Sequence, residues 1–140
     1  FVQDNLSWSR AGVVRGMHYQ LARHAMGKLV FVAAGAIFDV AVDLRRGSPT
    51  FAKWVGRTLS AENGLAMWVP GGFAHGFLAL EDSLVWYKCT AHHVPEAERC
   101  LHYKDPTVAI RWPFDPTLVS ERDASAPFLP EAEYDFEYEG

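Results

Sequence analysis

The sequence has 140 residues, of which 49% are hydrophobic and 21% are charged, and its formal net charge is -4. A chain of this length and composition buries one hydrophobic core, so we expect a single domain over residues 1–140. The mild acidic balance argues against nucleic acids and membrane surfaces as partners, and no apolar run approaches the roughly 18 residues of a membrane-spanning helix.

Apolar and polar residues alternate with a period of two along most of the chain, which predicts β-strands. In the run 35–44, for example, Asp39 and Asp43 share one face, and the apolar residues that alternate with them share the other. In chain order, the expected strands after a first one near the start are 12–20, 28–32, 35–44, 53–55, 66–69, 75–80 and 84–87.

The run 12–20 carries several polar residues whose direction matters for function. Strict alternation places Arg15 and Tyr19 on one face of this strand. The same alternation places Val14, Gly16 and His18 on the opposite face.

Turn residues separate the expected strands, at 46–49, 62–64, 70–72 and 81–83. Short strands with frequent turns are typical of an antiparallel sandwich or barrel. The only helical signal is a short turn at 120–124, and the acidic, aromatic residues after Pro130 predict a loosely held tail.

The two cysteines, Cys89 and Cys100, are too few for a disulfide framework, and we recognise no signal-peptide pattern. We therefore expect a cytoplasmic protein in which both cysteines are buried, small apolar residues. The five tryptophans are expected mostly in the core, with lining of a pocket as the alternative for Trp68 and Trp86.

One segment has the spacing of the second motif of the cupin barrels, with Gly64, Pro70, Gly72 and His75 in the matching places. Metal-binding cupins also carry two histidines one residue apart in their first motif. Here the corresponding place reads His-Tyr-Gln from position 18 to 20, with a single imidazole. Zinc and iron sites usually have three or four protein ligands, so we expect no metal and no other cofactor.

A longer, ordered series of segments resembles the dTDP-4-dehydrorhamnose 3,5-epimerase family from residue 1 to about residue 123. The segments are 1–5, 15–20, 27–30, 38–45, 47–50, 70–77, 87–90, 105–106, 112–113 and 120–123. The resemblance implies an all-β, cupin-type antiparallel β-barrel (jelly roll) with a short C-terminal helical turn. It also implies a homodimer and a substrate in which a 4-keto-6-deoxyhexose is linked to dTDP. Family members are usually longer at the N-terminus, so we expect a further native segment there.

The same resemblance assigns four catalytic residues to this chain. His18 would be the base that removes a proton from a carbon next to the ketone, and Asp123 would orient its imidazole. Tyr87 would donate a proton on the opposite face of the sugar, and Lys28 would stabilise the enolate oxygen. For each residue the structural alternative is an ordinary strand or surface side chain. Asp105, which precedes a proline, is instead expected to build a turn.

Five further residues are expected to bind the substrate. Arg15 would bind the diphosphate, because a guanidinium pairs with two phosphate oxygens. Polar contacts are expected from Gln3 and Asn5 on the first strand, from His75, and from Glu98 as a contact to the nucleotide. An aromatic residue that the family often has a little after Tyr87 is replaced here by two histidines, at 92 and 93.

Three kinds of function therefore stand in competition. The first is an epimerase that inverts C3 and C5, or a relative that inverts only one of these carbons in another deoxysugar pathway. The second is a metal-dependent cupin oxygenase or isomerase. The third is a cupin that binds a sugar nucleotide without turning it over. The intact set of His18, Lys28, Tyr87 and Asp123 favours the 3,5-epimerase.

Overall fold

A computed structural model describes all 140 residues, as ten strands, one short α-helix and three 3-10 turns. The strands are β1 (Gln3–Ser9), β2 (Val13–Gln20), β3 (Lys28–Ala34), β4 (Ala36–Asp43), β5 (Trp54–Ser60), β6 (Ala66–Val69), β7 (Phe73–Ala79), β8 (Ser83–Cys89), β9 (Glu98–Cys100) and β10 (Leu118–Val119). The helix α1 is Glu121–Ala124, and the 3-10 turns are Ala22–His24, Pro95–Ala97 and Leu129–Glu131. None of these helices has the length and apolar character needed to cross a bilayer.

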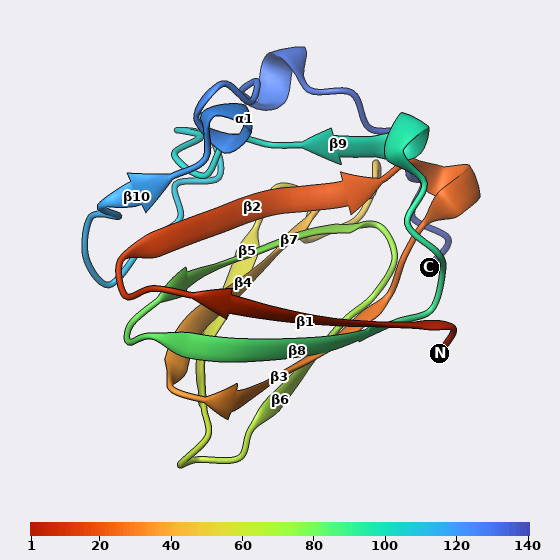
Figure 1. Cartoon of the computed structure of the whole chain (residues 1–140). Coiled ribbons are helices and arrows are strands. Elements are labelled where there is room, and N and C mark those ends of the chain that lie inside the picture. Colours follow the sequence, from red (N-terminus) through yellow and green to blue (C-terminus); the bar gives the residue numbers. More distant parts are fainter.

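The strands form two sheets that face each other (Figure 1). The smaller sheet has the order β1-β8-β3-β6, and the larger has the order β10-β2-β7-β4-β5, with β9 also paired to β2. Every pair is antiparallel except the short β10–β2 pair. Between the sheets lies a core to which both contribute, including Val30 and Val85 from the smaller sheet and Ile37 and Phe77 from the larger. The expected all-β jelly roll with a short C-terminal helical turn is confirmed.

A second core covers the outer face of the larger sheet. Met17 and Val42 point outward from this sheet and pack with Leu101, Leu129 and Phe136 of the C-terminal segment. In Figure 1 this segment, drawn in blue, lies across the top of β2 and β9. Strand β4 is therefore buried on both faces, which explains why polar and apolar positions of the alternating run 35–44 are equally inaccessible to water.

The buried aspartates of β4 have partners. The Asp43 carboxylate accepts hydrogen bonds from Arg45, Ser48 and Thr50. Burial alone would raise the pKa of Asp43, but these hydrogen bonds outweigh it and hold the pKa below its usual range. The network fixes the turn that follows β4, while Asp39 lies further back on the same strand and faces the interior.

The prediction of a loose C-terminal tail is wrong. Phe136 is 5% exposed and belongs to the second core. The amide of Arg46 donates to the carbonyl of Phe136, and the amide of Tyr138 donates to the carbonyl of Arg46. The acidic composition of the tail gave no indication of the buried Phe136 or of these backbone hydrogen bonds.

The expected turn at Asp105 is confirmed, because its carboxylate accepts hydrogen bonds from three backbone amides.

Most strand predictions are confirmed to within a few residues, and the differences have a common cause. Strand β5 runs over Trp54–Ser60 instead of 53–55, because backbone pairing to β4 extends along its polar half. The two-residue β10 and three-residue β9 were not predicted. Such short pairings depend on the backbone of a neighbouring strand, and they leave no period in the side-chain pattern.

Strand β2 departs from strict alternation at an irregularity between Arg15 and His18, where the pairing register to β7 shifts. A bulge of this kind places an extra residue on one strand and re-aims the side chains around it. Arg15 and His18 consequently line the same hollow, so their expected placement on opposite faces is wrong. Two glycines allow the strands to approach at this point: Gly16 has a φ of 122°, and its Cα lies close to Gly76.

We predict that Gly76→Ala destabilises the protein by about 2 kcal/mol, because the added methyl group overpacks the β2–β7 contact. An ideal Cβ at this position lies 2.5 Å from the carbonyl oxygen of Arg15 and 2.6 Å from the sulfur of Met17. Urea unfolding followed by circular dichroism measures the change. Gly71→Ala is the matched control. Its added Cβ would lie 3.2 Å from the Ala25 methyl group, and its next neighbours are 3.8 Å away. Equal stability of the two variants would contradict the prediction.

Candidate active site

Two adjoining hollows, both open to solvent, lie between the sheets. Four side chains line both hollows and therefore stand where the two meet: His18, Lys28, His75 and Tyr87. Three of these four were assigned catalytic roles from the sequence, and the fourth was assigned to substrate binding.

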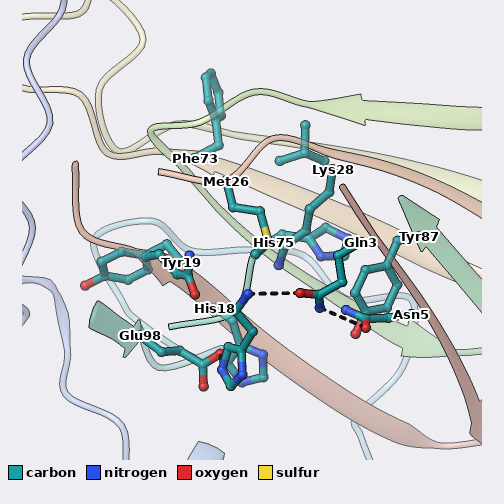
Figure 2. A pocket seen from close by; sticks show the side chains of 13 residues that line it. Gln3, Asn5, His18, Tyr19, Met26, Lys28, Phe73, His75, Tyr87 and Glu98 are labelled. Atoms are coloured by element: carbon teal, nitrogen blue, oxygen red, sulfur yellow. Dashed lines mark hydrogen bonds and ion pairs between the residues drawn. The ribbon is translucent and has the colours of Figure 1, made fainter. Parts of the chain in front are cut away.

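The two sheets divide these groups between them. His18 and His75 come from β2 and β7 of the larger sheet, whereas Lys28 and Tyr87 come from β3 and β8 of the smaller sheet. A flat ligand between the sheets would therefore meet imidazoles from one sheet and the phenol and ammonium from the other. Figure 2 shows Tyr87, together with Gln3 and Asn5, at one side of the cavity and His18 with Glu98 at another.

His18 forms a close hydrogen bond with Asp123, with 2.7 Å between His18 Nε2 and Asp123 Oδ1. Asp123 lies in α1, where Ser120 caps the helix by accepting a hydrogen bond from the Asp123 amide. The Gly16 amide donates to the other carboxylate oxygen. Burial would raise the pKa of Asp123, but the bonds from His18 and Gly16 outweigh it and hold the pKa at about 2. Asp123 is thus a carboxylate at neutral pH.

The direction of this hydrogen bond decides which ring nitrogen of His18 can act as a base. Because the Asp123 carboxylate is an acceptor, Nε2 carries the hydrogen in the neutral imidazole. Nδ1 then keeps its lone pair. His18 also lines the cavity, with 29% of its side chain exposed, so the imidazole is both oriented and accessible.

Cys100 also contacts this pair, and it is partly exposed rather than buried as expected. It lies directly opposite His18 on the neighbouring strand, and its Sγ is 3.5 Å from Asp123 Oδ1. Burial, reinforced by the Asp123 carboxylate, raises the pKa of the thiol. The thiol is therefore protonated and donates to Asp123. Cys89 is fully buried, as expected.

Burial acts in opposite directions on the two groups across the cavity. It raises the pKa of Tyr87, so this phenol keeps its proton at neutral pH. It lowers the pKa of Lys28, and no carboxylate lies within ion-pairing distance of that ammonium group. The Lys28 nitrogen lies 5.7 Å from the centre of the Tyr87 ring. A negative charge that develops beside Lys28 would therefore favour its ammonium form.

His75 belongs to a second histidine–aspartate pair that the sequence did not reveal. Its Nε2 is 2.6 Å from Asp39 Oδ1, and both side chains are almost fully buried. The other oxygen of Asp39 has no hydrogen-bond partner. An aspartate near the middle of a strand as apolar as β4 was the one available signal, because an unpaired carboxylate there would be costly. His75 is held rigidly, with one edge toward the cavity.

The residues expected to bind substrate all line this cleft. Gln3 and Asn5 line the first hollow, where the Gln3 amide donates to Asn5 and accepts from the backbone of His93. Arg15 lines the second hollow, and its Nε donates to Ser9. The rest of the guanidinium faces solvent and can accept an anion.

Glu98 begins β9 at the wall of the first hollow, and both of its oxygens have partners in the protein. One pairs with Arg122 and the other with His93, at 2.9 Å. Burial opposes ionisation, but the hydrogen bond and the charge of Arg122 outweigh it and lower the pKa of Glu98. His93, which replaces an aromatic residue common in the resembling family, thus joins the cavity wall through Glu98.

The sequence agrees with this geometry when it is compared with known proteins. The sequence model described as dTDP-4-dehydrorhamnose 3,5-epimerase matches residues 1–131. The chain belongs to the dTDP-4-dehydrorhamnose 3,5-epimerase family. The curated 3,5-epimerase of Pseudomonas aeruginosa is 57% identical over 125 residues, which cover 88% of this chain and 68% of the relative.

Solved structures of epimerases share the fold. A 3,5-epimerase from Legionella pneumophila, in complex with dTDP-4-keto-L-rhamnose, is 52% identical with a TM-score of 0.89, over 94% of this chain and 70% of that one. A 3'-monoepimerase from Streptomyces bikiniensis, in complex with dTDP-quinovose, is 36% identical with a TM-score of 0.86, over 91% of this chain and 66% of that one.

Several side chains of this epimerase's cavity were not expected from the sequence. Met26, Val69 and Phe73 give the first hollow an apolar side, and His93 contributes a polar one. Neither Trp68 nor Trp86 lines the cavity. Both belong to the smaller sheet, where Trp68 pairs with Leu29 and Trp86 with Phe31 of β3. Leu29 and Phe31 alternate with the inward-facing core residues of β3, so both tryptophans lie on the outer face. A lone apolar residue in a loop, such as Met26, gives no signal of a pocket.

We predict that Asp123→Asn makes the stability of the protein less sensitive to acid. The folded-state pKa of about 2 lies below the ordinary value of 3.8, so the carboxylate stabilises the fold above the ordinary pKa. That contribution is lost as the pH falls toward 2, and it amounts to about 2 kcal/mol. Urea unfolding at several values between pH 5 and pH 2 measures it. If the native protein and the variant lose equal stability between pH 5 and pH 2, Asp123 does not have a lowered pKa in the folded protein.

Proposed function

We propose that this chain is an isomerase that inverts C3 and C5 of dTDP-4-keto-6-deoxyglucose in dTDP-rhamnose biosynthesis. The observation that carries the proposal is the oriented His18 base on one sheet, facing the Tyr87 acid and the Lys28 cation on the other. The high identity to curated 3,5-epimerases supports the choice of substrate. The chemistry uses only proton transfers, so it requires no cofactor.

The first step removes a proton. The C4 ketone acidifies the hydrogens on C3 and C5, and His18 takes one of them through Nδ1 while Asp123 stabilises the resulting imidazolium. The electron pair of the broken C–H bond moves onto the ketone oxygen and forms an enolate. The Lys28 ammonium offsets this negative charge, and because no carboxylate competes for it, the cation is available to the substrate.

The second step returns a proton to the other face of the ring. Tyr87 keeps its proton at neutral pH and lies on the opposite sheet from His18, so it donates from the side that the base does not reach. The carbon is thereby inverted instead of restored. The His18 imidazolium then releases its proton to solvent and the Tyr87 phenolate takes one up from solvent. The cycle repeats at the second carbon.

The other polar groups of the cleft hold the substrate. The Arg15 guanidinium, whose Nε is fixed by Ser9, pairs with the diphosphate. Gln3 and Asn5 add amide hydrogen bonds. His75, oriented by Asp39, contacts the sugar, and Glu98 shapes the wall near the nucleotide together with His93.

We predict that proton NMR in heavy water will show the loss of both the C3 and the C5 hydrogen signals of dTDP-4-keto-6-deoxyglucose. His18→Asn lowers both exchange rates about 10²–10⁴-fold, because a general base contributes that much. Tyr87→Phe retains exchange but yields little inverted product, because it lacks the proton donor on the far face.

Two variants outside the cavity serve as controls, His102→Asn and Tyr138→Phe, and both should behave as the native protein does. Exchange at one carbon alone would replace the proposal with a mono-epimerase. Tight binding of the substrate without exchange would identify a sugar-nucleotide-binding cupin. Full inversion by Tyr87→Phe would show that another group is the acid.

We further propose that two copies of the chain associate through the outer face of the smaller sheet. Leu6 and Trp8 of β1 project outward there, with 59% and 56% of their surface exposed, and Trp68 is 51% exposed. The expectation that the tryptophans belong to the core is therefore wrong for Trp8 and Trp68. The charged pair on this face, Asp4 and Lys88, is neutralised within the chain. Such an uncharged apolar face suits a symmetric contact with its own copy.

We predict that Trp8→Glu converts a dimer into a monomer, because it places an unpaired charge on this apolar face. Sedimentation velocity of the native protein and the variant measures the change. Leu118→Glu is the control, since Leu118 is equally exposed, at 52%, but lies on β10 of the other sheet. A native protein that sediments as a monomer, or a Trp8→Glu variant that stays dimeric, would rule this interface out.

The cytoplasm remains the compartment that we propose for this enzyme. Cys89 and Cys100 are both free thiols. They lie in separate parts of the fold, one at the end of β8 and the other at the end of β9, and free thiols are stable in a reducing compartment.

A further inference from the structure

Three potential metal ligands meet beside the cavity, and each comes from a different element. His18 belongs to β2, Cys100 to β9 and Asp123 to α1. One ligand atom from each lies within 4.8 Å of the other two. The catalytic proposal uses His18 and Asp123 but gives no part to the Cys100 sulfur.

The distances from Asp123 to the other two ligand atoms are close to those of a tetrahedral zinc site. With bonds of about 2.0–2.3 Å to nitrogen, oxygen and sulfur, tetrahedral zinc ligands lie roughly 3.4–3.6 Å apart. The Cys100 sulfur already lies 3.5 Å from Asp123 Oδ1. His18 Nε2 lies 2.7 Å from the same oxygen, so the two atoms need to separate by about 0.7 Å.

We propose that His18, Cys100 and Asp123 form a site for Zn²⁺ that competes with catalysis. A neutral imidazole, a thiolate and a carboxylate are the three ligand types that zinc prefers. Their two negative charges balance the charge of the ion. Binding breaks the S–H bond of Cys100 and releases its proton to solvent, and the sulfur donates its electron pair to the metal. Mg²⁺ and Ca²⁺ prefer all-oxygen ligands, so the site selects against them.

The location of the site predicts its effect on the enzyme. Zinc bound to Nε2 of His18 occupies the lone pair of that nitrogen, so the hydrogen of the neutral ring must move to Nδ1. Nδ1 is the nitrogen that takes the substrate proton in the proposed mechanism. The bound ion therefore removes the base without touching Tyr87 or Lys28. This consequence rests on the proposed function, whereas binding of the metal does not.

Titration of the full-length, metal-free protein with Co²⁺, followed by absorption spectroscopy, tests binding without reference to activity. We expect one equivalent to produce the near-ultraviolet charge-transfer band of a cobalt thiolate, and Zn²⁺ to displace it. Cys100→Ser should abolish the band and weaken Zn²⁺ binding at least about 10-fold, because loss of a ligand costs at least as much as loss of its supporting contacts.

Two variants separate this site from the alternatives. Cys89→Ala removes the other thiol and should leave the band intact. His93→Ala removes the other exposed imidazole beside a carboxylate, the His93–Glu98 pair, and should leave Zn²⁺ affinity unchanged. Absence of the band at saturating Co²⁺, its persistence in Cys100→Ser, or loss of Zn²⁺ binding in His93→Ala would each overturn the proposal.

Turnover measured with and without Zn²⁺ tests the consequence for catalysis. The native enzyme should lose activity at the concentration that fills the site and regain it when a chelator is added. Inhibition of Cys100→Ser, measured against its own metal-free rate, should require at least about 10-fold more Zn²⁺. If the metal binds as described and the enzyme remains fully active, the inhibitory role is wrong. If the metal-free protein shows no epimerase activity but binds the metal as described, only the proposed function is refuted.

Discussion

The hydrogen bond between His18 and Asp123 joins residues 105 positions apart, and much of the structure is arranged around it. It requires the C-terminal segment to cross the outer face of the larger sheet, where Leu101, Leu129 and Phe136 anchor it in the second core. It also requires the irregularity in β2, because the Gly16 amide that this bend exposes binds the second oxygen of Asp123. The active site therefore depends on the whole fold.

Burial is the common cause of the electrostatic properties of the cleft, and its effect depends on the partners that each group has. Asp123 has donors to both of its oxygens, and the carboxylate persists despite burial. Burial raises the pKa of Tyr87, which keeps its proton, and it lowers the pKa of Lys28, which has no anionic partner. Negative charge that develops beside Lys28 favours its ammonium form, so one cavity holds the groups that the proposed function uses as base, acid and cation.

Two facing sheets provide a simple solution to the geometry of epimerisation. Inversion needs a base and an acid on opposite faces of one carbon, and in the proposed mechanism each sheet supplies one of them. The residues that reach the interior also use the two-residue period of the strands, since Gln3 and Asn5 point inward while Leu6 and Trp8 point outward. The same alternation that builds the cavity therefore produces the apolar outer face.

The sequence by itself determined the strand-rich fold and predicted the candidate site residues, because short-range alternation, turn residues and ordered motifs are properties of neighbouring positions. Its predicted set of His18, Lys28, Tyr87 and Asp123 lies together in the structure. Tertiary structure decided how these groups are used. The register shift of β2 directs both Arg15 and His18 toward one hollow. Pairing between β4 and β7 places Asp39 within hydrogen-bonding distance of His75. The approach of β9 brought Cys100 beside Asp123. The tail is held because Phe136 packs in the second core with Leu44, and because its backbone pairs with that of Arg46, 90 positions away in the chain. These features depend on contacts between distant segments, and no local pattern encodes which strands will meet or in which register.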